Sequence, residues 1–280
     1  MPTDRRGATS SVACPLCATP ATLVGDEPPW RVTCSSCGLQ WVTPPLEPKT
    51  SIDYQADCCV FDESGRSAVF DRIERLARAR LGDVGRALDV GCGAGAFMSL
   101  RDHRGWSVRG IDVNARAVET GRERGLAIEL GTLDAVHVEE PFDLVVFMNA
   151  LEYLAQPLDA LQRTHALLRP GGVIVVETPN TVYHSLQTRV GTRLGIRNDR
   201  LMFVEAQPGR RLMAFGPKSA RLALSAAGFV DIAVLPSLPR RAGALHERVM
   251  RRAIYAAAAV FASNGRLLTP SMLVAGTRAP

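Results

Sequence analysis

Short apolar runs alternate with segments of helical periodicity along most of the chain after Gly85. Between the runs, apolar residues recur every three or four positions, which is the spacing of one helix face. Strands that alternate with helices in this way form a mostly parallel sheet with helices on both faces. The expected strands are 87–91, 107–113, 126–130, 142–150, 171–179, 229–236 and 271–277, and the expected helices are 95–103, 114–124, 157–168, 217–227 and 245–262.

The first third of the chain has a different pattern. Residues 1–12 carry arginines and no apolar stretch behind them, so we expect a disordered tail rather than a signal peptide. Residues 49–84 are expected to form a linker and a leading helix, because apolar residues have helical spacing over 70–81. The α/β domain is then expected to occupy residues 85–280.

Four of the seven cysteines lie in two C-x2-C pairs, "CPLC" and "CSSC", with sixteen residues between the pairs. Two intervening residues let a tight turn aim both sulfurs at one ion, and this spacing is typical of a structural zinc ribbon. Four unrelated buried thiols are the alternative, which the equal spacing of the two pairs disfavours. We expect residues 13–48 to form a zinc ribbon with the ligands Cys14, Cys17, Cys34 and Cys37.

Composition and charge narrow the class of protein only a little. The chain is 46% hydrophobic and 22% charged, with a formal charge of +5, which is too mild to indicate a nucleic-acid partner by itself. The longest wholly apolar run, residues 253–262, is far shorter than the roughly 20 residues of a membrane span. We therefore expect no transmembrane helix and a cytoplasmic protein.

The stretch "RALDVGCGAGAF" lies at the end of the first expected strand of the sheet. Open α/β sheets bind ligands beyond the carboxyl ends of their strands. Asp89, Gly91, Gly93 and Gly95 spell D-x-G-x-G-x-G, and glycines there allow a sharp turn and close approach of a ligand. The nicotinamide fingerprint G-x-G-x-x-G has a different spacing. The stretch predicts a nucleotide-like cofactor site of another kind.

Asp112 ends the second expected strand, seventeen residues after Gly95. A carboxylate at this place accepts hydrogen bonds from the two hydroxyls of a ribose. An isolated Asp after a strand is more commonly a helix N-cap, but Asn114 is available for that role. Asp112 is therefore the expected ribose ligand.

From Arg86 to about Phe229 the chain resembles the class I S-adenosylmethionine-dependent methyltransferases, especially a bacterial small-molecule group. The matching residues are "LDVGCGAG", "LLRPGGVIVVETPN" (167–180) and "GPKSARLALSAAGF" (216–229). Several members also begin with a two-pair zinc ribbon and a proline-rich exit. The resemblance implies a Rossmann-like fold, an enzyme, and S-adenosylmethionine as cofactor.

The resemblance also implies roles for particular residues. Asp89, Gly91 and Gly93 would surround the methionine part of the cofactor, with Gly95 in the same turn. Leu133 and Asp134, in "GTLDA", would lie beside the adenine, although Asp134 could instead cap a helix. Asn149 would meet the methionine amino group and face the substrate.

Two histidines that are common in the family are absent. Where relatives have "LEHV" this chain has "LEYL" with Tyr153, and where relatives have "HLYxF" it has "RLMAF" with Arg211. Tyr153 could hydrogen-bond an acceptor hydroxyl, and Arg211 could clamp a phosphate or carboxylate. His184 is the nearest alternative base, but a lone histidine after a strand is more often a surface or packing residue. The candidate catalytic residues are Tyr153, His184 and Arg211.

Two basic regions have alternative interpretations. The arginine-rich region 183–211 could form the acceptor pocket or its lid and recognise phosphate groups, or it could be a solvated basic face. The expected helix 245–262 combines apolar residues with arginines and could lie on a membrane surface. We expect it to pack on the sheet, because the last strand follows it and needs a covered face.

The function expected from these observations is methyl transfer to a small molecule, O-directed, on a sugar, nucleotide-linked or natural-product intermediate. One alternative is a ribosomal RNA methyltransferase that binds RNA through its ribbon, but the segment between Cys14 and Cys37 has two acidic residues and one arginine. Another alternative is a non-catalytic cofactor-binding or scaffold protein. The sequence indicates neither the acceptor atom nor the oligomeric state.

Overall fold

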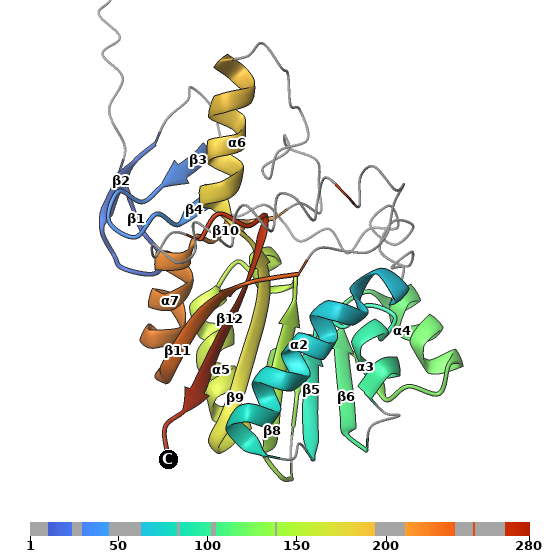
Figure 1. Cartoon of the computed structure of the whole chain (residues 1–280). Coiled ribbons are helices and arrows are strands. Elements are labelled where there is room, and N and C mark those ends of the chain that lie inside the picture. The colour runs from blue at the N-terminus through green and yellow to red at the C-terminus, as the bar shows by residue number, and fades with distance from the viewer. Residues whose placement is uncertain are drawn as a thin grey trace, which may run out of the picture.

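The computed structural model describes residues 11–23, 30–44, 63–82, 85–101, 105–137, 139–193, 211–238, 249 and 267–280. These residues form a large α/β domain and a small β ribbon at one end of its sheet (Figure 1). The expected helix 245–262 lies outside the described residues except for Val249.

Within the described residues, one seven-stranded sheet forms the centre of the large domain. Its strands are β5 (Arg86–Val90), β6 (Ser107–Asp112), β7 (Ile128–Leu130), β8 (Phe142–Met148), β9 (Leu168–Pro179), β11 (Phe229–Pro236) and β12 (Ser271–Arg278). The spatial order is β11-β12-β9-β8-β5-β6-β7. The neighbouring strands β9, β8, β5, β6 and β7 all pair in parallel. β12 is antiparallel to both of its neighbours, β9 and β11. The mostly parallel Rossmann-like sheet expected from the sequence is therefore confirmed.

Helices cover both faces of the sheet, and each face has its own hydrophobic core. One core joins the sheet to α2 (Glu63–Leu81), α3 (Ala96–Arg101) and α4 (Ala115–Glu123), as their buried residues Ile73, Met98 and Val118 show. The other core joins it to α5 (Pro157–Leu167) and α7 (Pro217–Ala226). The expected leading helix is thus part of the large domain.

The amino-terminal ribbon consists of two short hairpins. The first is β1 (Ser11–Ala13) with β2 (Pro20–Thr22), and the second is β3 (Trp30–Thr33) with β4 (Gln40–Thr43). β1 begins at Ser11, inside the segment 1–12 that the sequence assigns to a disordered tail. Residues 1–10 lie outside the described part.

The ribbon, which the sequence predicts over 13–48, packs against the large domain and shares its core. A two-residue strand, β10 (Met213–Ala214), pairs with β4 and makes the second hairpin a three-stranded sheet. The buried side chains of Cys34, Leu39 and Trp41 belong to the same hydrophobic core as those of α5 and α7. The ribbon lies above the carboxyl ends of the strands (Figure 1).

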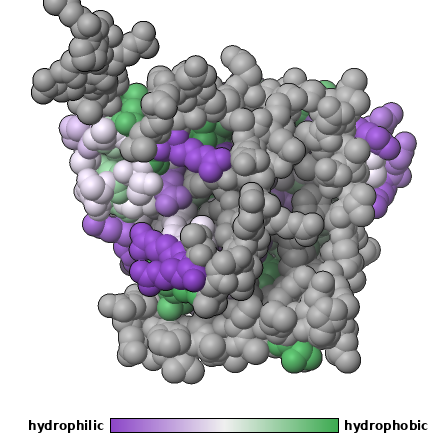
Figure 2. All heavy atoms as spheres, turned by 90° about the horizontal axis from the view of Figure 1, so that it is seen from above, coloured by the Kyte–Doolittle hydropathy of each residue, from purple (hydrophilic) through white to green (hydrophobic). Residues whose placement is uncertain are grey.

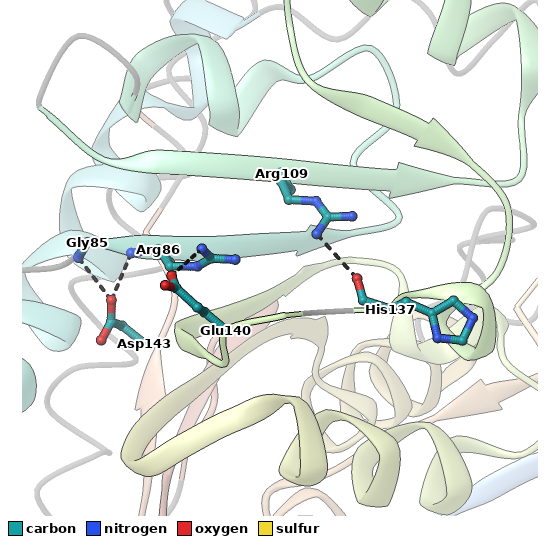
Figure 3. Close-up of polar contacts among 6 residues, drawn as sticks. All are labelled: Gly85, Arg86, Arg109, His137, Glu140 and Asp143. Atoms are coloured by element: carbon teal, nitrogen blue, oxygen red, sulfur yellow. Dashed lines mark hydrogen bonds and ion pairs between the residues drawn. The ribbon is translucent and has the colours of Figure 1, made fainter.

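At the end of the sheet opposite the ribbon, Asp143 joins the amino ends of neighbouring strands (Figure 3). Its Oδ2 accepts hydrogen bonds from the backbone N–H groups of Gly85 at 3.0 Å and Arg86 at 2.7 Å. Its Oδ1 accepts one from Arg169 Nε, in β9, at 2.5 Å. Arg86 also pairs with Glu140. These contacts hold β5, β8 and β9 in register.

A helix that the sequence pattern did not predict follows β9. α6 (Thr181–Arg193) stands beside the ribbon (Figure 1), and its residues Val182, Leu186 and Val190 are each 47% exposed. Seen from above, the described surface mixes hydrophilic and hydrophobic residues, with no single broad hydrophobic area in that view (Figure 2). None of the helices in the described ranges combines the length and apolarity needed to cross a membrane.

Candidate functional site

A cavity of about 330 Å³ opens at the carboxyl ends of β5, β6 and β8. Its wall is mostly apolar, with Phe70 of α2 and Met148 of β8 among the lining residues. Several candidate residues from the sequence line it, and they come from five separate stretches of the chain. These candidates are Asp89, Gly91, Gly93, Asp112, Leu133, Asn149, Tyr153 and Arg211.

The glycine turn after β5 forms the floor of the cavity. Gly91 and Gly93 have φ values of +70° and +56°, which an L side chain rarely adopts. A Cβ on Gly91 would lie 2.6 Å from the Cβ of Ala150, whereas one on Gly93 would meet nothing within 4 Å. The backbone at Gly93 is therefore open to a ligand.

Gly95 does not line the cavity, although the sequence places it with the cofactor residues. Its φ is +83°, and a Cβ there would lie 2.3 Å from Leu126 Cδ1 and 3.1 Å from Ile128 Cδ1. Gly95 thus packs the turn against Leu126 and Ile128, and its positive φ favours glycine there. The hydrogen bond from its N–H to Cys92 O, 3.0 Å long, closes the turn.

Asp112 is bonded directly to the glycine turn. Its Oδ2 accepts from the N–H of Gly93 at 2.7 Å, and its Oδ1 accepts from the N–H of Asn114 at 2.8 Å. Asn114, not Asp112, caps α4, by accepting from Ala117 N. Burial raises the pKa of the Asp112 carboxyl, while the backbone N–H donors act in the opposite direction. Each oxygen keeps a lone pair that a ribose hydroxyl can use.

The two candidates for adenine contact lie in the 3-10 turn η2 (Leu133–Ala135). Leu133 is 7% exposed and lines the cavity, so it offers an apolar surface to a ring. Asp134 is exposed and is not among the lining residues. Its proposed bond to an exocyclic amine stays a prediction.

Asn149 follows β8 and is held by a buried glutamate that the sequence reasoning missed. Its Nδ2 donates to Glu177 Oε2 at 3.0 Å, and Ser237 Oγ donates to the other oxygen, Oε1, at 2.7 Å. Asn149 also has a positive φ of 55°, unusual for a residue other than glycine. Because its amide nitrogen faces Glu177, its carbonyl oxygen is the atom available to an ammonium group. The signal in the sequence was a Glu that directly follows the apolar run 173–176.

Tyr153 and Arg211 also line the cavity, and both are neighbours of Glu152, a second residue that the sequence reasoning missed. Tyr153 and Glu152 belong to the turn η3 (Leu151–Tyr153). The Glu152 carboxylate is completely buried, and its Oε1 lies 3.5 Å from Arg211 Nε. Burial raises the pKa of Glu152 to about 7, and the positive charge of Arg211 opposes that rise. Arg211 is the one cation among the described residues of the lining.

His184 does not reach the cavity, so its geometry does not support the catalytic role considered from the sequence. It lies on α6, where its Nε2 is 3.0 Å from the carbonyl oxygen of Pro270. Burial lowers the pKa of its imidazole, which is then neutral at neutral pH. This placement matches the packing alternative. Of the arginine-rich region 183–211, only Arg211 lines the cavity among the described residues.

The four ribbon cysteines come together in the knuckles of the two hairpins. Their sulfurs all lie within 4.8 Å of one another, with Cys14 and Cys37 3.7 Å apart and Cys17 and Cys34 3.5 Å apart. Four sulfurs placed tetrahedrally about 2.3 Å from a zinc ion lie about 3.8 Å apart. The donor set and its dimensions therefore fit one zinc ion, as expected from the sequence.

Comparisons with known proteins agree with this geometry. A family model described as "Methyltransferase domain" matches residues 61–234, more than half of the chain. A ubiquinone biosynthesis O-methyltransferase of Actinobacillus pleuropneumoniae is 33% identical over 123 residues, which are 39% of this chain and 51% of that protein. The chain thus spans about half the length of the curated relatives it matches.

Solved structures show the same fold at low sequence identity. An S-adenosylmethionine-dependent methyltransferase from Clostridium acetobutylicum superposes with a TM-score of 0.53 at 12% identity, over 81% of this chain and all of that one. Magnesium protoporphyrin IX methyltransferase from Synechocystis, solved with bound S-adenosylhomocysteine, gives a TM-score of 0.50 at 13% identity. That match covers 81% of this chain and 94% of the other.

Proposed function

The chain belongs to the methyltransferase domain family, and on that premise we propose that it transfers a methyl group from S-adenosylmethionine to a hydroxyl of a small molecule. The observation that carries the proposal is the direct bond between the glycine turn and Asp112, 2.7 Å long, at the floor of one cavity. The O-methyltransferase relatives support oxygen as the acceptor atom.

In this proposal the cofactor half of the cavity is made by β5, β6 and β8. Asp112 accepts the ribose hydroxyls, Leu133 covers the adenine, and the backbone at Gly93 lies against the methionine part. Asn149, with its amide nitrogen engaged by Glu177, accepts a hydrogen bond from the methionine ammonium through its carbonyl oxygen. When bound, S-adenosylmethionine supplies a methyl group already activated on a positively charged sulfur.

The acceptor half is the end lined by Tyr153, Leu154 and Arg211. Holding donor and acceptor atoms about 3–3.5 Å apart supplies much of the rate of such a displacement. Tyr153 would orient the acceptor hydroxyl by a hydrogen bond; the hydroxyl proton would pass to solvent water as the C–O bond forms and the methyl–sulfur bond breaks. We propose that the acceptor also carries a carboxylate or phosphate, since Arg211 is suited to a bidentate contact with either group. Sugar, nucleotide-linked and natural-product acids all meet this description.

Calorimetric titration with S-adenosylhomocysteine tests the cofactor assignment. We expect binding by the unaltered protein and a loss of affinity of about tenfold or more for Asp112→Ala, because the ribose hydroxyls lose a charged acceptor. Glu119→Ala is the matched control, since Glu119 is an exposed carboxylate on α4 outside the cavity. Absence of binding heat with folded protein would refute the proposal.

Acceptor chemistry is tested by transfer of a labelled methyl group to a panel of hydroxylated compounds with and without an acidic group. Turnover on neither set would favour a non-catalytic binding protein, and turnover only on ribosomal RNA would favour the RNA alternative. We expect turnover on the acidic set.

We also propose that Cys14, Cys17, Cys34 and Cys37 bind one structural zinc ion as thiolates. The sulfur separations and the burial of three of the four side chains support this assignment. With all four ligands protein thiolates, the ion would have no open position for catalysis.

A further inference from the structure

The segment that carries Arg211 is bonded on both sides. The N–H of Leu212, the next residue, donates to the carbonyl oxygen of Glu152 at 2.8 Å. The carbonyl oxygen of Leu212 accepts from the N–H of Val42, in β4, at 3.0 Å. One residue thus connects the turn that lines the cavity to the ribbon.

The connection continues as a strand. Met213 lies opposite Trp41 and Ala214 opposite Gln40 in the β10–β4 pair. Leu212, Met213 and Ala214 are all nearly fully buried. Residues 211–214 therefore form a joint, with Arg211 in the cavity at one end and a strand of the ribbon sheet at the other.

On the ribbon side, the joint is close to the cysteine cluster. Cys34 and Cys37 lie in the turn between β3 and β4, where Cys34 N donates to Leu39 O at 2.8 Å. Leu39 is fully buried and immediately precedes β4. A second tie comes from Lys218 of α7, whose Nζ donates to the carbonyl oxygen of Ser36, between the two cysteines. The position of β4 thus depends on the knuckle that holds the cysteines.

On the cavity side, Glu152 contacts the joint twice, once by a hydrogen bond and once by an ion pair. Its backbone oxygen holds Leu212, and its buried carboxylate lies 3.5 Å from Arg211 Nε. Thr178 Oγ1 donates to the other carboxylate oxygen at 3.4 Å. Glu152 does not line the cavity, so its effect on a bound molecule passes through Arg211.

We propose that the ribbon is a positioning device for the acceptor site: β4, fixed by metal at the four cysteines, and Glu152 together hold Arg211 in the cavity. The cofactor half is built differently, from the mutual bonds of β5 and β6, such as Gly91 N to Ile111 O at 2.8 Å. Loss of the metal therefore releases the acceptor side and leaves the cofactor side in place. This role of the ribbon concerns the acceptor end of the cavity, so it rests on the proposed function.

Hydrogen exchange tests the joint without any need for turnover. Val42→Pro removes the N–H that bonds Leu212 O and touches no cysteine, while Val42→Ala at the same position keeps it. We expect Val42→Pro to retain zinc and to speed exchange in peptides covering 211–215 by about tenfold relative to Val42→Ala, with no change over 107–112. Removal of zinc from the unaltered protein by a chelator is expected to speed hydrogen exchange over residues 40–43 and 211–215.

The Arg211 side chain itself gives the second readout. In protein with isotope-labelled arginine, the Nε–H resonance that disappears in Arg211→Lys belongs to Arg211. We expect it to move toward its solvent value in Val42→Pro and in Glu152→Gln, and to stay in place in Val42→Ala. Binding of S-adenosylhomocysteine is expected to change by less than about threefold in Val42→Pro, within about 0.7 kcal/mol.

Equal exchange over 211–215 in the proline and alanine variants, or an unmoved Arg211 resonance in Val42→Pro, would overturn the inference. A loss of S-adenosylhomocysteine affinity of more than about threefold in Val42→Pro would also overturn it, because the effect would then not be confined to the acceptor side. Absence of S-adenosylhomocysteine binding in the unaltered protein would refute the proposed function instead. The comparison of hydrogen exchange in Val42→Pro and Val42→Ala would still test the joint.

Discussion

At the scale of single residues, the three glycines of the turn have three different roles. Gly91 needs its conformation and also the space beside Ala150, Gly93 needs its conformation and faces open space, and Gly95 packs against the side chains of Leu126 and Ile128. An alanine in the left-handed region costs about 1–2 kcal/mol wherever it is placed. Comparing alanine substitutions at Gly91 and Gly93 separates this conformational cost from the cost of a steric clash.

We predict that Gly91→Ala lowers the free energy of unfolding more than Gly93→Ala does. Both substitutions strain φ, but the new methyl at Gly91 would lie 2.6 Å from a Cβ that cannot rotate away. Gly93→Ala should instead weaken S-adenosylhomocysteine binding, because Gly93 lines the cavity and the new methyl would have no protein atom within 4 Å. Denaturant unfolding and calorimetric titration of the two variants measure both effects, and equal stabilities would contradict the assignment.

Two glutamates at this scale, Glu152 and Glu177, were not selected by sequence reasoning although both lie in quoted motifs. A carboxylate in "LEYL" or "ETPN" has no local pattern that tells whether it is buried. Burial and the partners Arg211 and Asn149 come from segments tens of residues away. The two carboxylates could therefore be interpreted only once those segments were placed together.

At the scale of secondary-structure elements, the amino ends of the strands depend on Asp143. Burial alone would raise the pKa of its carboxyl, but the hydrogen bonds from Arg169, Arg86 and Gly85 together hold that pKa below its ordinary value of 3.8. A carboxyl with a lowered pKa in the folded state stabilises the protein above its ordinary pKa. This stabilisation is lost as the pH falls through the folded-state pKa.

We predict that Asp143→Asn lowers the free energy of unfolding by about 1–3 kcal/mol at neutral pH, since an amide cannot accept all three hydrogen bonds and carries no charge for Arg169. The difference from the unaltered protein should shrink as the pH falls below 3.8, where the native carboxyl also becomes neutral. Urea unfolding at a series of pH values measures it. A difference independent of pH would mean that the carboxylate charge is not responsible.

Most long elements were predictable because each has a complete local pattern. The helices at 114–124, 157–168 and 217–227 agree with α4, α5 and α7 to within a residue or two. β10 was missed because a strand of two residues has no period, and its existence depends on β4, about 170 residues earlier in the chain. α6 was missed although Val182, Leu186 and Val190 have helical spacing, because the region 183–211 was interpreted from its arginines as a pocket, a lid or a solvated face.

At the scale of the whole molecule, the ribbon and the large domain share one buried cluster. Cys34, Leu39 and Trp41 belong to the same core as Leu212, Phe215 and Leu224. A segment that shares its core with a neighbour unfolds with it as one cooperative unit.

We predict a single calorimetric transition for the zinc-loaded protein, and a fall in its midpoint of several degrees when zinc is removed, because the metal binds the folded ribbon in preference to the unfolded one. Zinc content measured on the same sample serves as the control. A separate small transition for the ribbon, with the main midpoint unmoved, would show that the two parts are independent.

The sequence by itself determined the Rossmann-like fold class, the two cysteine pairs and the glycine turn with its neighbouring aspartate, because each of these is marked by a residue spacing or an alternation along the chain. The tertiary structure alone decided which residues meet across segments. It showed that β10 pairs with the ribbon strand β4, that Glu152 forms an ion pair with Arg211, that Glu177 bonds Asn149, and that His184 contacts Pro270 and does not line the cavity. These contacts join residues that are far apart in the chain, and no local periodicity encodes such a contact until the core has brought the segments together.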